Sequence, residues 1–147
     1  MTKYLLAVTF EPGIETAPMS EWTSDEIEAH LAYYGTLNRE LIDRGELLDS
    51  TILAPPEQGK VVRSDGRNAP MVTDGPFLET KEWLAGYQIV DVESEQRALE
   101  IAARLSSVPG QRGIPIQQPI QVRPILDEGP SSTEEMREYA ASAEGVA

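Results

Sequence analysis

Two helix-forming segments, each placed between segments with the pattern of β-strands, constrain the fold of this chain more than any other feature. The first strand segment reads KYLLAVTF, and its alternate residues from Tyr4 to Phe10 fall on one face. Leu5 and Ala7 make the other face apolar as well. We therefore expect this strand to be covered on both sides.

The first helix is predicted by signals at both of its ends. Thr23 and Glu26 have the spacing of a capping box, and Gly45 is a natural stop after a helix over residues 25–44. Gly35 lies inside this helix, where it suggests close packing or a close backbone approach. The expected apolar stripe consists of Ile27, Leu31, Tyr34, Leu41 and Ile42.

The rest of the chain continues the alternation of strands and helices. ELLDSTILAPP reads as a strand that ends at Pro55, and Asp65 with Gly66 predicts a hairpin in the segment that follows. AGYQIVDV is a further strand, preceded by Trp83 and Leu84, which we expect to be buried. IQVRPIL is the closing strand. Between these last two strands, a helix capped by Ser94 presents one apolar face made of Ala98, Ile101, Ala102 and Leu105.

This order of elements predicts an α+β protein with the ferredoxin-like, split βαβ fold and a hairpin insertion. Such a sheet carries its two helices on one face and leaves the other face without cover. Because the first strand is apolar on both sides, we predict a homodimer that closes across the bare faces.

The 147 residues suffice for one domain, and the composition excludes several classes of protein. Without cysteine there are no disulfides, thiolate nucleophiles or cysteine-ligated metals. The net charge of −13 argues against direct binding to nucleic acid or to a membrane surface. No signal peptide or membrane span is recognisable, so we expect a cytoplasmic location.

His30 is the one histidine and the natural candidate for proton transfer near neutral pH. The stretch TDGPF brings Asp74 to a rigid turn, from which its carboxylate would orient the imidazole if the fold joins the two residues. The competing interpretations are ordinary: a packed, hydrogen-bonded histidine and a rigid connector.

Other sites are less well supported by the sequence. Tyr33 and Tyr34 are candidates to position a substrate, and Arg63 and Arg123 to bind its carboxylate, although these arginines are also typical solvated charges. The motifs of zinc proteases, phosphate-binding loops, dinucleotide-binding folds and serine hydrolases are missing, and the acidic residues are scattered. We therefore predict no metal and no cofactor.

The segment DGPFLETKEWLAGYQIVDVES resembles the signature of the DGPF group of the YCII-related family, with matching positions from Asp74 to Gly86. The likeness also includes KYLLAV, YGTLNRELIDRGELL and the closing strand. It implies a dimeric α+β barrel. It also implies either a catalytic histidine–aspartate pair, as suspected in broader relatives, or an association with sigma factors. Many DGPF proteins lack a histidine at the position of His30.

Two functions follow from these observations. The first is a small cofactor-free enzyme in which His30 and Asp74 carry out acid-base chemistry on a small oxygenated organic molecule. The second is a non-catalytic ligand-binding or regulatory protein associated with sigma-factor-dependent transcription. We expect the domain to span residues 1–126 and to be followed by an acidic tail, 127–147, that is either a short docking helix or disordered.

Overall fold

The structure is a computed structural model, and it describes residues 1–10, 17–74 and 83–144. The strands are β1 (Thr2–Phe10), β2 (Leu47–Ile52), β3 (Lys60–Arg63), β4 (Met71–Asp74), β5 (Trp83–Val92) and β6 (Ile120–Pro124). The helices are α1 (Ser24–Asp43), α2 (Glu95–Ser106) and α3 (Thr133–Glu144), with short 3-10 turns η1 (Met19–Glu21), η2 (Pro56–Gln58) and η3 (Gln111–Gly113). The predicted order of strands, helices and hairpin is confirmed.

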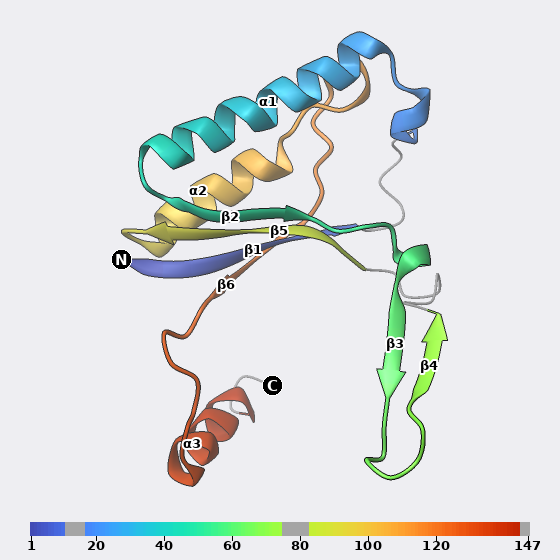
Figure 1. The fold of residues 1–147 in the computed structure, drawn as a ribbon. Helices are drawn as coiled ribbons and strands as arrows, with labels where there is room; N and C mark the ends of the chain where they lie inside the picture. Colours follow the sequence, from blue (N-terminus) through green and yellow to red (C-terminus); the bar gives the residue numbers. More distant parts are fainter. Residues whose placement is uncertain (11–16, 75–82, 145–147) are drawn as a thin grey trace.

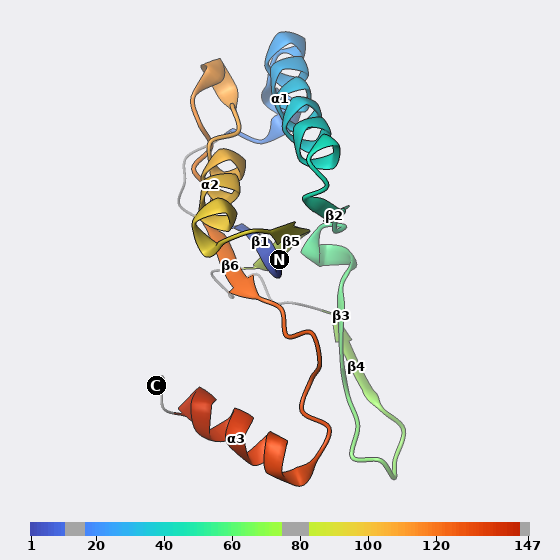
Figure 2. The ribbon, with the colours of Figure 1, turned by 90° about the vertical axis from the view of Figure 1, so that its left-hand side faces the viewer.

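Four of the strands form one antiparallel sheet in the order β2-β5-β1-β6, and β3 pairs only with β4. Helices α1 and α2 lie side by side on one face of the four-stranded sheet (Figure 1, Figure 2). This is the split βαβ arrangement, so the predicted α+β class with a ferredoxin-like topology is confirmed.

Helix α1 begins as its capping box predicts. The amide of Glu26 donates to the Thr23 hydroxyl, and the Glu26 carboxylate accepts from the Thr23 amide. Gly45 ends the helix at a φ of +73°. The predicted apolar stripe is partly wrong, because Leu31 and Ile42 are both 61% exposed. Gly35 is also not a close-packing position, since a Cβ added there would have open space around it.

The core fills the space between the sheet and the two helices. Strands β1 and β5 contribute alternate residues, and α2 contributes its predicted apolar face. The fully or largely buried members are Tyr4, Leu6, Leu37, Leu41, Val90, Val92, Ala98, Ile101, Ala102 and Leu105. This side of the sheet therefore has the continuous apolar interior that stabilises a domain of this size.

The opposite face of the sheet, the open face, carries the alternate set of side chains. Leu5 pairs with Ile89 and Ala7 pairs with Tyr87, one position out of phase with the core residues. Among the described residues, no helix covers these positions, as both views show (Figure 1, Figure 2). The predicted bare face is thus present on the protomer.

The β3–β4 hairpin and α3 both lie on the side of the open face, away from α1 and α2 (Figure 1). Every residue of β3 and β4 is exposed. The turn between them is held by Asp65, which accepts from the amides of Arg67 and Asn68, and by Gly66 at a φ of +76°.

Strand β5 begins earlier than the pattern AGYQIVDV predicts. Trp83 is already in the strand and half-buried, and Leu84 is exposed, so the expected burial of Leu84 is wrong. Gly86 lies within the strand, where a Cβ would come within 2.7 Å of the Thr51 carbonyl oxygen on β2. The glycine thus permits close strand pairing.

Candidate functional site

His30 lies on α1 in a small aromatic cluster. Its ring packs edge-on against Trp22, with centroids 5.5 Å apart, and against Tyr34, with centroids 5.2 Å apart. Its Nδ1 lies 2.9 Å from the carbonyl oxygen of Pro109, in the connection between α2 and β6. Trp22, Val108 and Ile116 form the buried centre of this cluster. These contacts match the alternative interpretation of the sequence, in which His30 is a packed, hydrogen-bonded histidine.

The Pro109 contact defines how the imidazole can act. A carbonyl oxygen only accepts hydrogen bonds, so Nδ1 carries the hydrogen. In the neutral ring, Nε2 then holds the lone pair and is the nitrogen that can accept a proton. A backbone carbonyl therefore takes the orienting part that the sequence assigned to an aspartate.

Asp74 is the last residue of β4, and its side chain is 84% exposed. It forms an ion pair with Lys60, directly opposite it in the hairpin. The hydrogen bond from Lys60, together with the Lys60 charge, holds the pKa of the Asp74 carboxyl below its ordinary value. The turn that follows Asp74, residues 75–77, lies outside the described residues.

The structure does not bring His30 and Asp74 together within one chain. His30 belongs to α1, which covers one face of the sheet, whereas Asp74 belongs to the hairpin on the other side (Figure 1). Each side chain has its own partner, Pro109 and Lys60 respectively. The catalytic roles of these residues therefore stay a prediction.

The four predicted substrate-binding residues are also distributed over separate parts of the fold. The Tyr33 hydroxyl donates to the Arg104 carbonyl oxygen at 2.7 Å, joining α1 to α2. Tyr34 packs edge-on against His30, and burial raises the pKa of its phenol. Arg63 is exposed on the hairpin, and Arg123 lies on β6 opposite Leu5, on the open face. The four residues thus lie on three separate elements: α1, the hairpin and β6.

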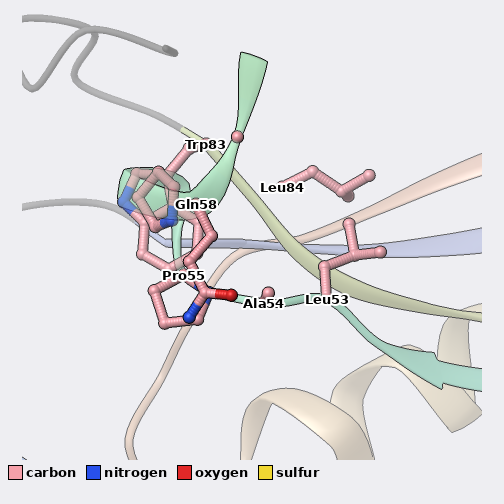
Figure 3. Close-up of a pocket in the computed structure, with 8 residues that line it drawn as sticks. Leu53, Ala54, Pro55, Gln58, Trp83 and Leu84 are labelled. Atoms are coloured by element: carbon pink, nitrogen blue, oxygen red, sulfur yellow. The ribbon is translucent and has the colours of Figure 1, made fainter. Parts of the chain in front are cut away.

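A pocket of about 350 Å³ opens where β2 and β5 meet the foot of the hairpin. Its lining is almost entirely apolar and consists of Leu53, Ala54, Pro55, Pro56, Gln58, Gly59, Trp83 and Leu84. Figure 3 shows Leu53 and Leu84 toward one end of the group and Trp83 with Pro55 and Gln58 toward the other. Its volume lies near the lower end of the range of small-molecule sites, and the Gln58 side chain adds an amide to its lining.

Sequence reasoning missed this pocket, although one signal pointed to it. Strand β2 ends at Ile52, and Pro55 and Pro56 then lead into η2, where the chain lines the pocket together with Trp83. The pocket depends on the strand pairing that brings Leu53 beside Ala85. The Leu53 amide donates to the Ala85 carbonyl oxygen at 2.9 Å.

Sequence reasoning also missed a buried ion pair on the helix-covered side. Glu46 is 5% exposed and accepts two hydrogen bonds of 2.9 Å from the Arg97 guanidinium, with a further one of 2.8 Å from Arg44. These bonds, led by those from Arg97, lower the pKa of Glu46 against the effect of its burial. The pair fixes the start of β2 to α2 and has no substrate-accessible position, so we assign it a structural role.

Two negative findings bear on cofactors and membranes. In the part of the chain that the structure describes, no group of three or more histidine, aspartate and glutamate side chains has a metal-binding arrangement. Helices long and apolar enough to cross a membrane are likewise not found within the described ranges.

Comparison with known proteins places the chain in a family. Residues 2–114 match the model of the YCII-related domain, which covers β1 to η3 and leaves β6 and α3 outside. An uncharacterised protein of Rhizobium meliloti (strain 1021) is 30% identical over 106 residues, which is 72% of this chain and 81% of that protein. The name of that relative assigns no activity.

Proposed function

We propose that this chain, which belongs to the YCII-related family, is a homodimer that binds a small apolar organic molecule in the pocket beside Trp83. The pocket is the observation that carries the proposal. Its volume suits a molecule of modest size, its walls are aliphatic and aromatic, and Gln58 offers a hydrogen bond to orient the ligand. The signature from Asp74 to Gly86 supports membership of the DGPF group, and Trp83 and Leu84 of the pocket fall within that signature.

The homodimer is supported by the open face. Tyr87 and Ile89 lie on it beside Leu5 and Ala7, so an apolar centre faces away from the protomer's own core. A second copy with its sheet turned toward this one covers both faces at once, as in a two-layer α+β barrel.

Binding without catalysis is the form of the proposal that the contacts favour. His30 is engaged by Pro109 and two aromatic rings, and Asp74 by Lys60, so neither side chain is directed into the pocket lining. A regulatory role near sigma-factor-dependent transcription rests on the family resemblance alone. Co-purification of this chain with a sigma factor would test that role. We propose that the protein is cytoplasmic.

Ligand binding is tested with the fluorescent probe 8-anilinonaphthalene-1-sulfonate. Leu84→Arg places a guanidinium in the pocket, and Leu99→Arg on α2 is its matched control, because the two leucines are 44% and 46% exposed. We expect saturable binding to the wild type and to Leu99→Arg, and at least tenfold weaker binding to Leu84→Arg. Equal binding by all three proteins contradicts the pocket as the site. Light scattering on each variant shows whether the dimer is retained.

A second candidate function, acid-base catalysis by His30, is favoured by one observation. The Pro109 carbonyl fixes the hydrogen on Nδ1 and leaves Nε2 as a base. The test measures exchange of α-protons from small ketones and lactones in D₂O by NMR. His30→Asn keeps a donor for Pro109 and removes the base, so it should abolish exchange while the fold and the dimer survive. Exchange that persists in His30→Asn contradicts this function.

A further inference from the structure

One row of residues crosses the open face with an acid at one edge and a base at the other. Strand pairing sets Asp49 of β2 beside Ile89 of β5. Ile89 pairs in turn with Leu5 of β1, which pairs with Arg123 of β6. Residues that pair directly across neighbouring strands share one face of a sheet. The row therefore runs from a carboxylate through two aliphatic side chains to a guanidinium.

The two charged ends of this row have no ion-pair partner among the described residues of their own chain. The ion pairs found there involve other residues, and Asp49 accepts a hydrogen bond from the neighbouring Thr51 hydroxyl. Asp49 and Arg123 are both exposed. They belong to opposite edge strands, three strand spacings or about 14 Å apart, which is too far for an ion pair within one chain.

A second acid and base lie on the open face, next to the first row. Asp91 of β5 lies directly opposite Lys3 of β1, yet the two side chains form no ion pair in the described part of the chain. The Oδ1 atom of Asp91 is buried, and no described residue provides it with a hydrogen bond. A buried carboxylate oxygen without a partner costs free energy, which a cation from a second copy would offset.

Two limiting orientations of a two-fold axis bring two open faces together, and they differ in which strands meet. An axis that runs across the strands lays each strand on its own copy, so β2 meets β2 and β6 meets β6. An axis parallel to the strands exchanges the two edges of the sheet. In the order β2-β5-β1-β6, β2 then meets β6 and β5 meets β1. The second orientation alone sets the acid of each row against the base.

We propose that two copies of this chain pack their open faces with the two-fold axis parallel to the strands, so that Asp49 of each copy pairs with the partner's Arg123 and Asp91 with the partner's Lys3. Ile89 then packs on the partner's Leu5. This inference rests on the homodimer of the proposed function, and it adds the direction of the axis and the contacts that fix it.

The space between the sheets suits these contacts. Facing sheets pack about 10 Å apart, a gap that the long side chains of arginine and lysine can bridge to a carboxylate. Helix α3 lies below the open face (Figure 2), and residues 125–132, which lead to it, form no helix or strand. The proposal therefore requires α3 to move aside where the second copy packs.

Charge reversal tests the pairing across the dimer. Arg123→Glu sets like charges against Asp49 at both edges and should raise the dimer dissociation constant about tenfold at low salt, as measured by analytical ultracentrifugation. Adding Asp49→Arg restores opposite charges and should recover most of that affinity. Arg39→Glu, an exposed position on α1, is the matched control and should leave the constant unchanged. A double variant as weak as Arg123→Glu overturns the pairing.

Cysteine cross-linking tests the direction of the axis, because the chain contains no cysteine of its own. The single variants Asp49→Cys and Arg123→Cys are mixed, allowed to exchange subunits and treated with a short bismethanethiosulfonate reagent. We expect a covalent dimer from the mixture and little from either variant alone. Leu31→Cys, exposed on α1, replaces Arg123→Cys in the control mixture and should not cross-link. Covalent dimers from Asp49→Cys alone overturn the proposal, because they place β2 against β2.

Failure of the axis and failure of the homodimer give different results. A mixture that stays uncross-linked, together with a double charge variant that does not recover, overturns the axis when light scattering still shows a wild-type dimer. That result leaves the homodimer of the proposed function intact. A wild type that is monomeric at every concentration removes both the axis and the homodimer on which it rests.

Discussion

The two faces of the four-stranded sheet differ in how their side chains are stabilised. The helix-covered face packs Leu6, Leu41 and Ile101 into a continuous core, and the Glu46–Arg97 ion pair joins the start of β2 to α2. The open face presents apolar residues to the space between the hairpin and α3, and both of these elements are exposed throughout their described residues. The first face holds the protomer together, and the second is suited to hold two protomers together.

The largest effect should come from a deletion in the covered core. Leu41→Ala removes a fully buried side chain and should lower the free energy of unfolding by about 3 kcal/mol. Val62→Ala, on the hairpin, should change it by less than about 0.5 kcal/mol in dilute protein. Urea unfolding followed by circular dichroism measures both. Equal losses of unfolding free energy in the two variants would contradict the difference between the covered face and the open side.

The buried ion pair should give the next largest effect, and one that depends on pH. Arg97→Met leaves the Glu46 carboxylate in its buried site with only Arg44, and should cost about 2 kcal/mol at pH 7. The pKa of Glu46 is lowered in the folded protein, so the pair stabilises the fold above the ordinary carboxyl pKa of 4.5. This contribution is lost as the pH falls through the lowered value.

Unfolding curves of the wild type and Arg97→Met between pH 7 and pH 3 test this dependence. The two proteins should become more alike as the solution is made acidic. Arg63→Met on the exposed hairpin is the matched control and should show no such convergence. A gap that stays constant down to pH 3 contradicts the role assigned to the Glu46 carboxylate.

A smaller effect is expected from one hydroxyl group. Tyr33→Phe removes the bond to the Arg104 carbonyl oxygen between α1 and α2, and should cost about 1 kcal/mol. Tyr139→Phe, on the open side in α3, should be neutral in dilute protein because that side chain is half exposed. Thermal unfolding of the two variants compares the same chemical change on the two sides of the sheet.

The smallest effect on the protomer should follow removal of the tail. Ending the chain after Leu126 deletes α3, whose described residues are all exposed. The stability of dilute protein should change by less than about 0.5 kcal/mol. A large loss of protomer stability would show that α3 supports its own subunit.

The fold followed from the sequence because its signals are local. The capping box at Thr23, the Ser94 cap and the apolar face of α2 depend on residues a few positions apart, and the structure confirms each of them. The predicted apolar stripe on α1 is wrong at Leu31 and Ile42, which are exposed, because the apolar residues of the helix fit two overlapping faces. Only the approach of the sheet selects between them.

The candidate site was harder to predict because its contacts join distant residues. The Pro109 carbonyl that holds His30 is 79 positions away, in a loop with no pattern to reveal it. The Lys60 partner of Asp74 follows from the hairpin register, which the Asp65-Gly66 turn locates but does not fix. The pocket at Trp83 required the pairing of β2 with β5, which is a property of the whole sheet.

The mass of the particle in solution tests the central claim most directly, because the open face needs a second copy to cover it. Size-exclusion chromatography with light scattering should give twice the mass of one chain at micromolar concentration. Arg123→Glu with Tyr87→Glu, which places charge on the open face, should shift the particle toward the single-chain mass. A wild type that elutes at the mass of one chain at every concentration would contradict the account.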